Sequence, residues 1–279
     1  MSANYSKSIR FDTRPDEYRP FMVDNFAKRA AEIANQRPVI RQQIYDLLAS
    51  WRGTSYTAAM PKLIPDAIAD SIEGHRRGGQ NDHDSPERID AQLTLLARRV
   101  PEISTDPQLR DKLTTAIWAT ASELREAVTS LPPLVTRQDA WDHYTTLAPF
   151  LMGLDQTMRN SYVSVFAAYE AFVTATTSIA LNGERCRVTP QNAFHDQLQR
   201  AFQNKSRSIW HDDEIKTAKL IRHAMVHAAG RETDDVKDRD HHLVVDDGIL
   251  YVFPVHLRNL YSVLKAGANE IMNHKRFAK

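Results

Sequence analysis

Apolar side chains recur every three to four residues along most of this 279-residue chain, a spacing typical of amphipathic helices. The pattern predicts helices over residues 21–35, 39–51, 64–75, 86–100, 107–128, 137–150, 155–181, 191–203 and 257–271. Because proline lacks a backbone N–H and clashes with the preceding turn, breaks are expected at Pro38, Pro61, Pro65 and Pro101. The sequence therefore predicts an all-α fold.

The spacing changes near the end of the chain. Residues 243–245 and 249–253 form two short apolar runs around Asp247-Gly248, a dipeptide favoured in two-residue hairpin turns. One β-hairpin over residues 242–253 is therefore expected within the helical fold. Leu131-Pro132-Pro133 is expected to separate a helical N-terminal domain, residues 1–130, from a second helical domain, residues 135–279.

The amino-acid composition indicates which kinds of protein this chain can be. Apolar residues make up 42% and charged residues 25%, the balance of a soluble globular chain. The net charge is +1, so a surface for nucleic acid has to be a local patch. Cys186 is the single cysteine, which excludes an intrachain disulfide and fits a reducing compartment. With no apolar signal core or run of about 18 apolar residues, a cytoplasmic chain without a membrane segment is expected.

The residues that indicate a chemical function lie in the stretch 221–230. Asp212 or Asp213 can cap the helix that bears it, and Gly230 can close that helix. Its core stripe consists of Ala218, Ile221, Ala224, Met225 and Ala228. The opposite face consists of Lys216, Lys219, Arg222, His223, Val226 and His227, a set suited to phosphate. Arg222 and His227 are about 140° apart around the helix, so they flank this face rather than touch.

Arginine and histidine on one exposed helix face suffice for RNA cleavage without a metal, because the 2′-hydroxyl of RNA is an internal nucleophile. A histidine can transfer a proton near neutral pH, and a guanidinium can hold the phosphate and its developing charge. His227 is assigned as base or acid, Arg222 as the phosphate ligand and His223 as a second polar group. The expected product is a 2′,3′-cyclic phosphate.

The stretch Leu220-Ile221-Arg222-His223-Ala224-Met225-Val226-His227 resembles the signature of the HEPN (higher eukaryotes and prokaryotes nucleotide-binding) superfamily. That signature is an arginine, a polar residue directly after it, and a histidine after four to six residues; His223 stands where asparagine is commonest. Phe166-Ala167-Ala168-Tyr169-Glu170-Ala171-Phe172 is similar to the acidic, aromatic-flanked position in the family's long early helix. The resemblance covers roughly residues 137–271.

This resemblance implies a helical, usually dimeric protein, and many members are metal-independent ribonucleases that act as toxins or in antiphage defence. Their two motifs meet across the dimer interface in one composite site. Glu170 would orient the arginine or the histidine by a charge-assisted hydrogen bond. The implied partners are an RNA substrate, a second copy of the chain and an antitoxin or regulatory partner, with no cofactor and no metal. Residues 1–130 would sense a trigger, restrain the activity or recruit a target.

Two alternatives stay open. The first is a non-catalytic HEPN module for dimerisation or nucleotide binding. The second is a metal-dependent hydrolase, because His223 and His227, four residues apart, have the spacing of metal ligands. This second alternative needs a third ligand, for which the candidates are His195, His211 and Asp213.

Overall fold

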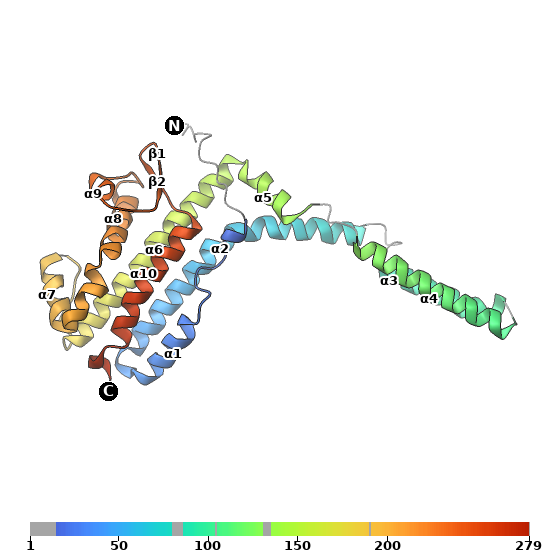
Figure 1. Cartoon of the computed structure of the whole chain (residues 1–279), viewed down its shortest axis with the longest axis horizontal. Coiled ribbons are helices and arrows are strands. Elements are labelled where there is room, and N and C mark those ends of the chain that lie inside the picture. The colour runs from blue at the N-terminus through green and yellow to red at the C-terminus, as the bar shows by residue number, and fades with distance from the viewer. Residues whose placement is uncertain (1–14, 80–85, 104, 131–134, 190, 279) are drawn as a thin grey trace. The chain divides into compact units, whose positions relative to one another are not determined.

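The chain is mostly helical, with one two-stranded sheet (Figure 1). The computed structural model describes residues 15–79, 86–103, 105–130, 135–189 and 191–278. The predicted all-α class with one inserted hairpin is confirmed. The chain divides into two compact units, one formed by residues 1–63 with 145–279 and the other by residues 64–144.

The first unit contains the helices that bear the candidate site. They are α1 (Phe26–Gln36), the start of α2 (Arg41–Gly79), α6 (Ala148–Ala180), α7 (Gln191–Phe202), α8 (Asp213–His227), α9 (Asp234–Lys237) and α10 (Pro254–Met272). The hairpin consists of β1 (Val244–Asp246) and β2 (Ile249–Tyr251). Short 3₁₀ turns occupy Pro15–Glu17, Pro38–Ile40, Gln203–Lys205 and Lys275–Phe277, and a π-helical turn spans Arg207–His211.

Aromatic side chains fill the core of this unit. Trp51 of α2 is fully buried, contacts the rings of Phe26 and Tyr261, and donates a hydrogen bond from Nε1 to the carbonyl of Val165 at 3.0 Å. A second group surrounds Trp210 and includes Phe166, Tyr169 and Phe194. Burial of several large rings is the main source of stability for such a bundle.

The two compact units differ from the expected domains 1–130 and 135–279. Residues before α1 lie on α10: Asp24 accepts hydrogen bonds from Tyr261 at 2.9 Å and from Lys265 at 2.6 Å, and Arg258 donates to the carbonyl of Glu17 at 3.0 Å. The N-terminal helices thus complete the core of the C-terminal ones. The expected boundary at residues 131–133 lies outside the described residues.

The second unit consists of the remainder of α2, α3 (Pro86–Ile103), α4 (Pro107–Ser130) and α5 (Arg137–Thr145). Helices α3 and α4 pack side by side (Figure 1). Trp141 of α5 is buried, and Arg137 forms an exposed ion pair with Asp70 of α2 at 3.2 Å. Exposed pairs of this kind contribute little stability, so packing holds this unit together.

Helix α6 is the core helix of the first unit, where it packs against α7, α8 and α10. It is also long and apolar enough to cross a membrane, with a mean hydropathy of 1.3 in a window of which 44% is buried inside the protein. Length and hydropathy alone are weak evidence, because the core helix of a globular bundle meets the same criterion.

Gly267 of α10 allows a close approach between three elements. The hydroxyl of Tyr169 donates to the carbonyl of Ile209 at 2.6 Å, and a Cβ at position 267 would collide with that hydroxyl. Gly267→Ala is therefore expected to lower the free energy of unfolding by about 1–3 kcal/mol. Gly53→Ala is the matched control, since nothing lies within 4 Å of its Cβ position; it should raise stability by about 0.5–1 kcal/mol in urea denaturation. Equal effects of the two substitutions would refute this role for Gly267.

His256 holds the first turn of α10, where its Nδ1 accepts a hydrogen bond from the backbone N–H of Phe253 at 2.9 Å. Burial lowers the pKa of His256 from 6.5 to about 4. The neutral form is thus favoured by folding, and its contribution to stability is complete above pH 6.5 and lost as the pH falls through 4. The unfolding free energy of the wild type is expected to fall more steeply between these pH values than that of His256→Asn, which retains an acceptor near Nδ1. Parallel pH profiles would contradict this.

Candidate functional site

Helix α8 begins and ends where the sequence predicts. The Asp212 side chain accepts a hydrogen bond from the backbone N–H of Glu214 at 3.0 Å, which caps the helix. At the other end Gly230, with φ +80°, donates to the carbonyl of Ala224 at 3.1 Å. The predicted turn at Asp247-Gly248 also forms, with positive φ at both residues. Backbone hydrogen bonds from Leu250 to Gly230 and from Glu232 to Gly248, both 2.8 Å, join the hairpin to the end of α8.

Arg159 of α6 anchors the C-terminal end of α8. Its guanidinium forms an ion pair with Asp155 at 3.0 Å, donates to the carbonyl of Ala229 at 3.3 Å and lies over the ring of Tyr251. A Cβ at Gly230 would displace this guanidinium, and the positive φ of Gly230 is one that L side chains rarely adopt, so glycine is favoured there mainly by its backbone angle. A cation at a helix C-terminus is favourable. These contacts fix α8 on α6.

The two faces of α8 have the predicted environments. Ala218, Ile221 and Ala224 are buried against the core, while Met225 and Ala228 are half-buried. On the opposite face His223 and His227 are exposed, and Val226 between them is 46% exposed. The six residues of this opposite face (Lys216, Lys219, Arg222, His223, Val226 and His227) are called the basic face below.

His223 and His227 lie next to each other on α8, whereas Arg222 is not hydrogen-bonded to either of them in the described structure. The rings of His223 and His227 have centroids 4.5 Å apart. Arg222 is half-buried, and its Nε is buried without a hydrogen-bond partner among the described residues. Within one chain the described contacts include no hydrogen bond between Arg222 and either histidine. A buried N–H without an acceptor is costly, so Arg222 has an unsatisfied donor beside this face.

Glu170 of α6 is half-buried, and the described contacts show no hydrogen bond or ion pair between its carboxylate and Arg222 or His227. Its charge acts on Lys219 instead. Burial lowers the pKa of the Lys219 ammonium, the negative charge of Glu170 opposes that shift, and the positive charge of Arg222 adds to it. Lys219 also lies over the ring of Trp210 at 5.8 Å. Glu170, Lys219 and Arg222 therefore form a charged cluster between α6 and α8.

Lys219 belongs to this cluster, whereas helical periodicity alone places it only on the basic face. Its position one turn before Arg222 was a visible signal, because residues three apart on a helix are neighbours. The contribution of Glu170 could not be derived in the same way, since it depends on the packing of α6 against α8.

The metal-dependent alternative lacks a third ligand. Among the described residues no three histidine, cysteine, aspartate or glutamate side chains lie together in a way that could hold a metal ion. His195 and His211 pair with each other, with Nδ1 and Nε2 2.6 Å apart. Asp213 forms an ion pair with Lys216 at 3.1 Å. None of the three candidate ligands therefore joins His223 and His227.

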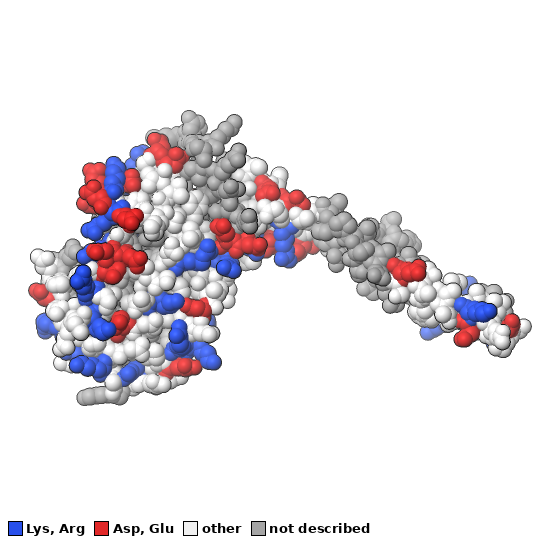
Figure 2. Space-filling model, viewed as in Figure 1, with Lys and Arg blue, Asp and Glu red and all other residues white. Residues whose placement is uncertain are grey.

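Lysine and arginine side chains alternate with aspartate and glutamate over the surface seen in Figure 2. This mixture agrees with the net charge of +1, so the basic face of α8 is a local feature. No model of a known protein family matches the chain, and no curated protein or solved structure matches it. The residues with candidate chemistry are those of α8 and those that pack against it.

Proposed function

We propose that this chain is a metal-independent endoribonuclease of HEPN type, acting as a cytoplasmic toxin or defence effector. The observation that carries the proposal is the basic face itself, where two exposed histidines stand beside an arginine with an unsatisfied donor. The positive charges of Arg222 and Lys219 can attract a phosphate to this face, and an exposed imidazole can transfer a proton to or from an RNA hydroxyl.

In the proposed reaction His227 removes the proton from a ribose 2′-hydroxyl, and the 2′-oxygen attacks the adjacent phosphorus. The bond from phosphorus to the 5′-oxygen breaks, and that oxygen takes up a proton from His223. Arg222 and the nearby Lys219 stabilise the charge on the phosphate oxygens. The products are a 2′,3′-cyclic phosphate and a 5′-hydroxyl end.

We propose further that the site is built from two copies of the chain. Arg222 and His227 lie about 140° apart on one helix, so a two-fold pairing of α8 can place Arg222 beside His227 of the partner subunit. The exposed Val226 at the centre of this face supports such a contact, because an apolar side chain amid charged ones gains from being covered.

Induced expression tests the function in cells. Wild-type protein is expected to arrest growth and to produce new cyclic-phosphate RNA ends, and Arg222→Ala and His227→Ala at matched protein levels are expected to do neither. Arg231→Ala, an exposed arginine beyond the end of α8, is the matched control and should behave as wild type. Arrest that persists in both site variants would refute the proposal. Stable dimers that bind RNA or nucleotide without cleaving RNA would establish the non-catalytic HEPN module instead.

A further inference from the structure

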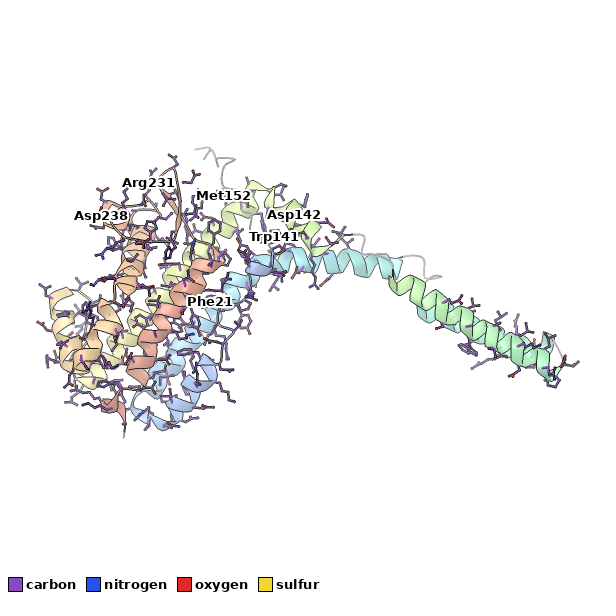
Figure 3. All side chains as sticks on the ribbon, in the orientation of Figure 1. Phe21, Trp141, Asp142, Met152, Arg231 and Asp238 are labelled. Atoms are coloured by element: carbon purple, nitrogen blue, oxygen red, sulfur yellow. The ribbon has the colours of Figure 1, made fainter. Side chains whose placement is uncertain are left out.

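The outer edge of strand β1 is open. The hairpin of β1 and β2, seen in Figure 1, has one further pairing: Arg231, labelled in Figure 3, forms an isolated bridge to Ile249 on the other side of β2. Among the described residues no strand lies beside β1 on its outer side. Val244 and Val245 of β1 are 43% and 38% exposed. Proteins usually protect an edge strand with proline, lysine or a covering segment, and an unprotected apolar edge is a template for a further strand.

The backbone of β1 presents hydrogen-bonding groups at this edge. Asp246 and Ile249 face each other across the two-residue turn, so they exchange hydrogen bonds, and such pairs alternate with non-bonded ones along an antiparallel ladder. The N–H and C=O groups of Val245 and of Leu243 therefore point away from β2. The described backbone hydrogen bonds outside the ladder include none from either residue. A second strand can take up all four groups.

The sequence of this edge is complementary to itself in the antiparallel direction. The segment 241–247 reads His241-His242-Leu243-Val244-Val245-Asp246-Asp247. Imidazoles thus stand at one end, carboxylates at the other and apolar side chains between them. A second copy aligned antiparallel about Val244 brings the exposed His242 opposite Asp246 of the partner subunit, and the same contact occurs twice. An imidazole N–H can donate to a carboxylate, so the two ends attract each other.

We propose that β1 pairs antiparallel with β1 of a second copy of the chain, which joins the two hairpins into one four-stranded sheet. In this register Leu243 and Val245 exchange hydrogen bonds with Val245 and Leu243 of the partner subunit, and Val244 meets the partner's Val244 on the two-fold axis. A shift by one residue would set outward backbone groups against inward ones. A shift by two would separate His242 from Asp246 of the partner subunit. The charges and the hydrogen-bond pattern therefore select the same register.

This sheet would lie beside the end of α8, because the hairpin is hydrogen-bonded to Gly230 and Glu232 directly beyond that helix. A pair of short strands buries less than the roughly 800 Å² per partner of a typical stable interface, so the strands set the register of a larger contact between two copies. In this respect the inference rests on the two-copy arrangement proposed above, with the basic face of α8 as the remaining surface. It does not depend on RNA cleavage.

Val244→Cys in the full-length protein tests the pairing. On the two-fold axis the two Cα atoms of residue 244 would be about 4.5 Å apart, within the range of a disulfide. Treatment with oxidised glutathione is expected to link most chains into dimers on a non-reducing gel. Val255→Cys is the matched control, because Val255 is 42% exposed and lies on α10, outside the β1 edge. It should not link, and neither should the wild type, in which Cys186 is buried.

A charge exchange supplies a second readout. His242→Asp places carboxylates opposite each other at two points and is expected to raise the dimer dissociation constant about tenfold in sedimentation equilibrium. Adding Asp246→His restores the complementary pair and should return the constant to within about threefold of the wild type. Equal linking of Val244→Cys and Val255→Cys, or no rescue by the second substitution, would overturn the strand pairing. A dimer that persists without linking would leave the two-copy ribonuclease site in place, whereas a wild-type protein that is monomeric throughout would remove both.

Discussion

Replacing Arg222 or His227 by alanine is expected to lower the rate of RNA cleavage by purified protein at least about 100-fold. The expected size follows from the roles assigned: proton transfer by a positioned group contributes roughly 10²–10⁴-fold, and a donor aimed at developing phosphate charge contributes a similar factor. His223→Ala should lower the rate by a similar factor, since His223 donates the proton to the leaving 5′-oxygen in the proposed reaction. A chelator should leave the wild-type rate unchanged, since none of these side chains acts through a metal.

Conservative substitutions and a control make this prediction specific. Arg222→Lys keeps the positive charge but loses the planar pair of donors, so its activity should lie between those of the wild type and Arg222→Ala. Circular dichroism and gel filtration must show that each variant folds and associates as the wild type does. Arg231→Ala should retain full activity. Cleavage at wild-type rates by Arg222→Ala or His227→Ala would remove that residue from the site.

Trp51→Ala is expected to lower the free energy of unfolding by about 3–5 kcal/mol. The side chain is fully buried, contacts the rings of Phe26 and Tyr261, and donates a hydrogen bond to the carbonyl of Val165. Its removal would leave a cavity where α1, α2, α6 and α10 meet. Trp51→Phe should cost less, because most of the ring packing is retained.

Trp118→Ala is the matched control for this experiment. Trp118 lies in the second unit and is 43% exposed, so its loss is expected to cost less than about 1 kcal/mol in urea denaturation. Losses of equal size in Trp51→Ala and Trp118→Ala would contradict the finding that the N-terminal helices complete the C-terminal core.

Local features were predictable from the sequence because they depend on neighbouring residues. The cap at Asp212, the closure at Gly230 and the turn at Asp247-Gly248 all formed as expected. The two faces of α8 followed from helical periodicity alone. The charged segment 234–240 begins with the short helix α9, which the apolar spacing did not indicate.

Three of the four expected breaks at prolines were wrong, two of them for a tertiary reason. Pro61 and Pro65 lie inside α2, and Pro101 lies inside α3. A proline within a helix costs about 3 kcal/mol, but the rings of Pro61 and Pro65 are buried on one face of α2, and packing there offsets part of that cost. Burial of this kind cannot be derived from the local pattern.

The assembly of the first unit depends on contacts between residues far apart in the chain. The hydrogen bonds from Tyr261 and Lys265 to Asp24 span 237 and 241 residues, and nothing in either segment identifies its partner. The charged cluster of Glu170, Lys219 and Arg222 also depends on contacts between distant segments. It could not be predicted from the sequence for the same reason. The chemistry of the residues on α8 was visible in the sequence, whereas their environment required the structure.

A mixing experiment tests most directly whether Arg222 and His227 form a metal-independent ribonuclease site between two copies of the chain. Purified Arg222→Ala and His227→Ala are each assayed on RNA in the presence of a chelator, and then together after their subunits have exchanged. Each variant alone should be inactive. The mixture should recover about a quarter of the wild-type activity, because half of the dimers are mixed and each of these keeps one of the two symmetry-related pairs of Arg222 with His227. Inactive variants with no recovery after verified exchange would contradict the shared site, and activity of either variant alone would contradict the assignment of its residue.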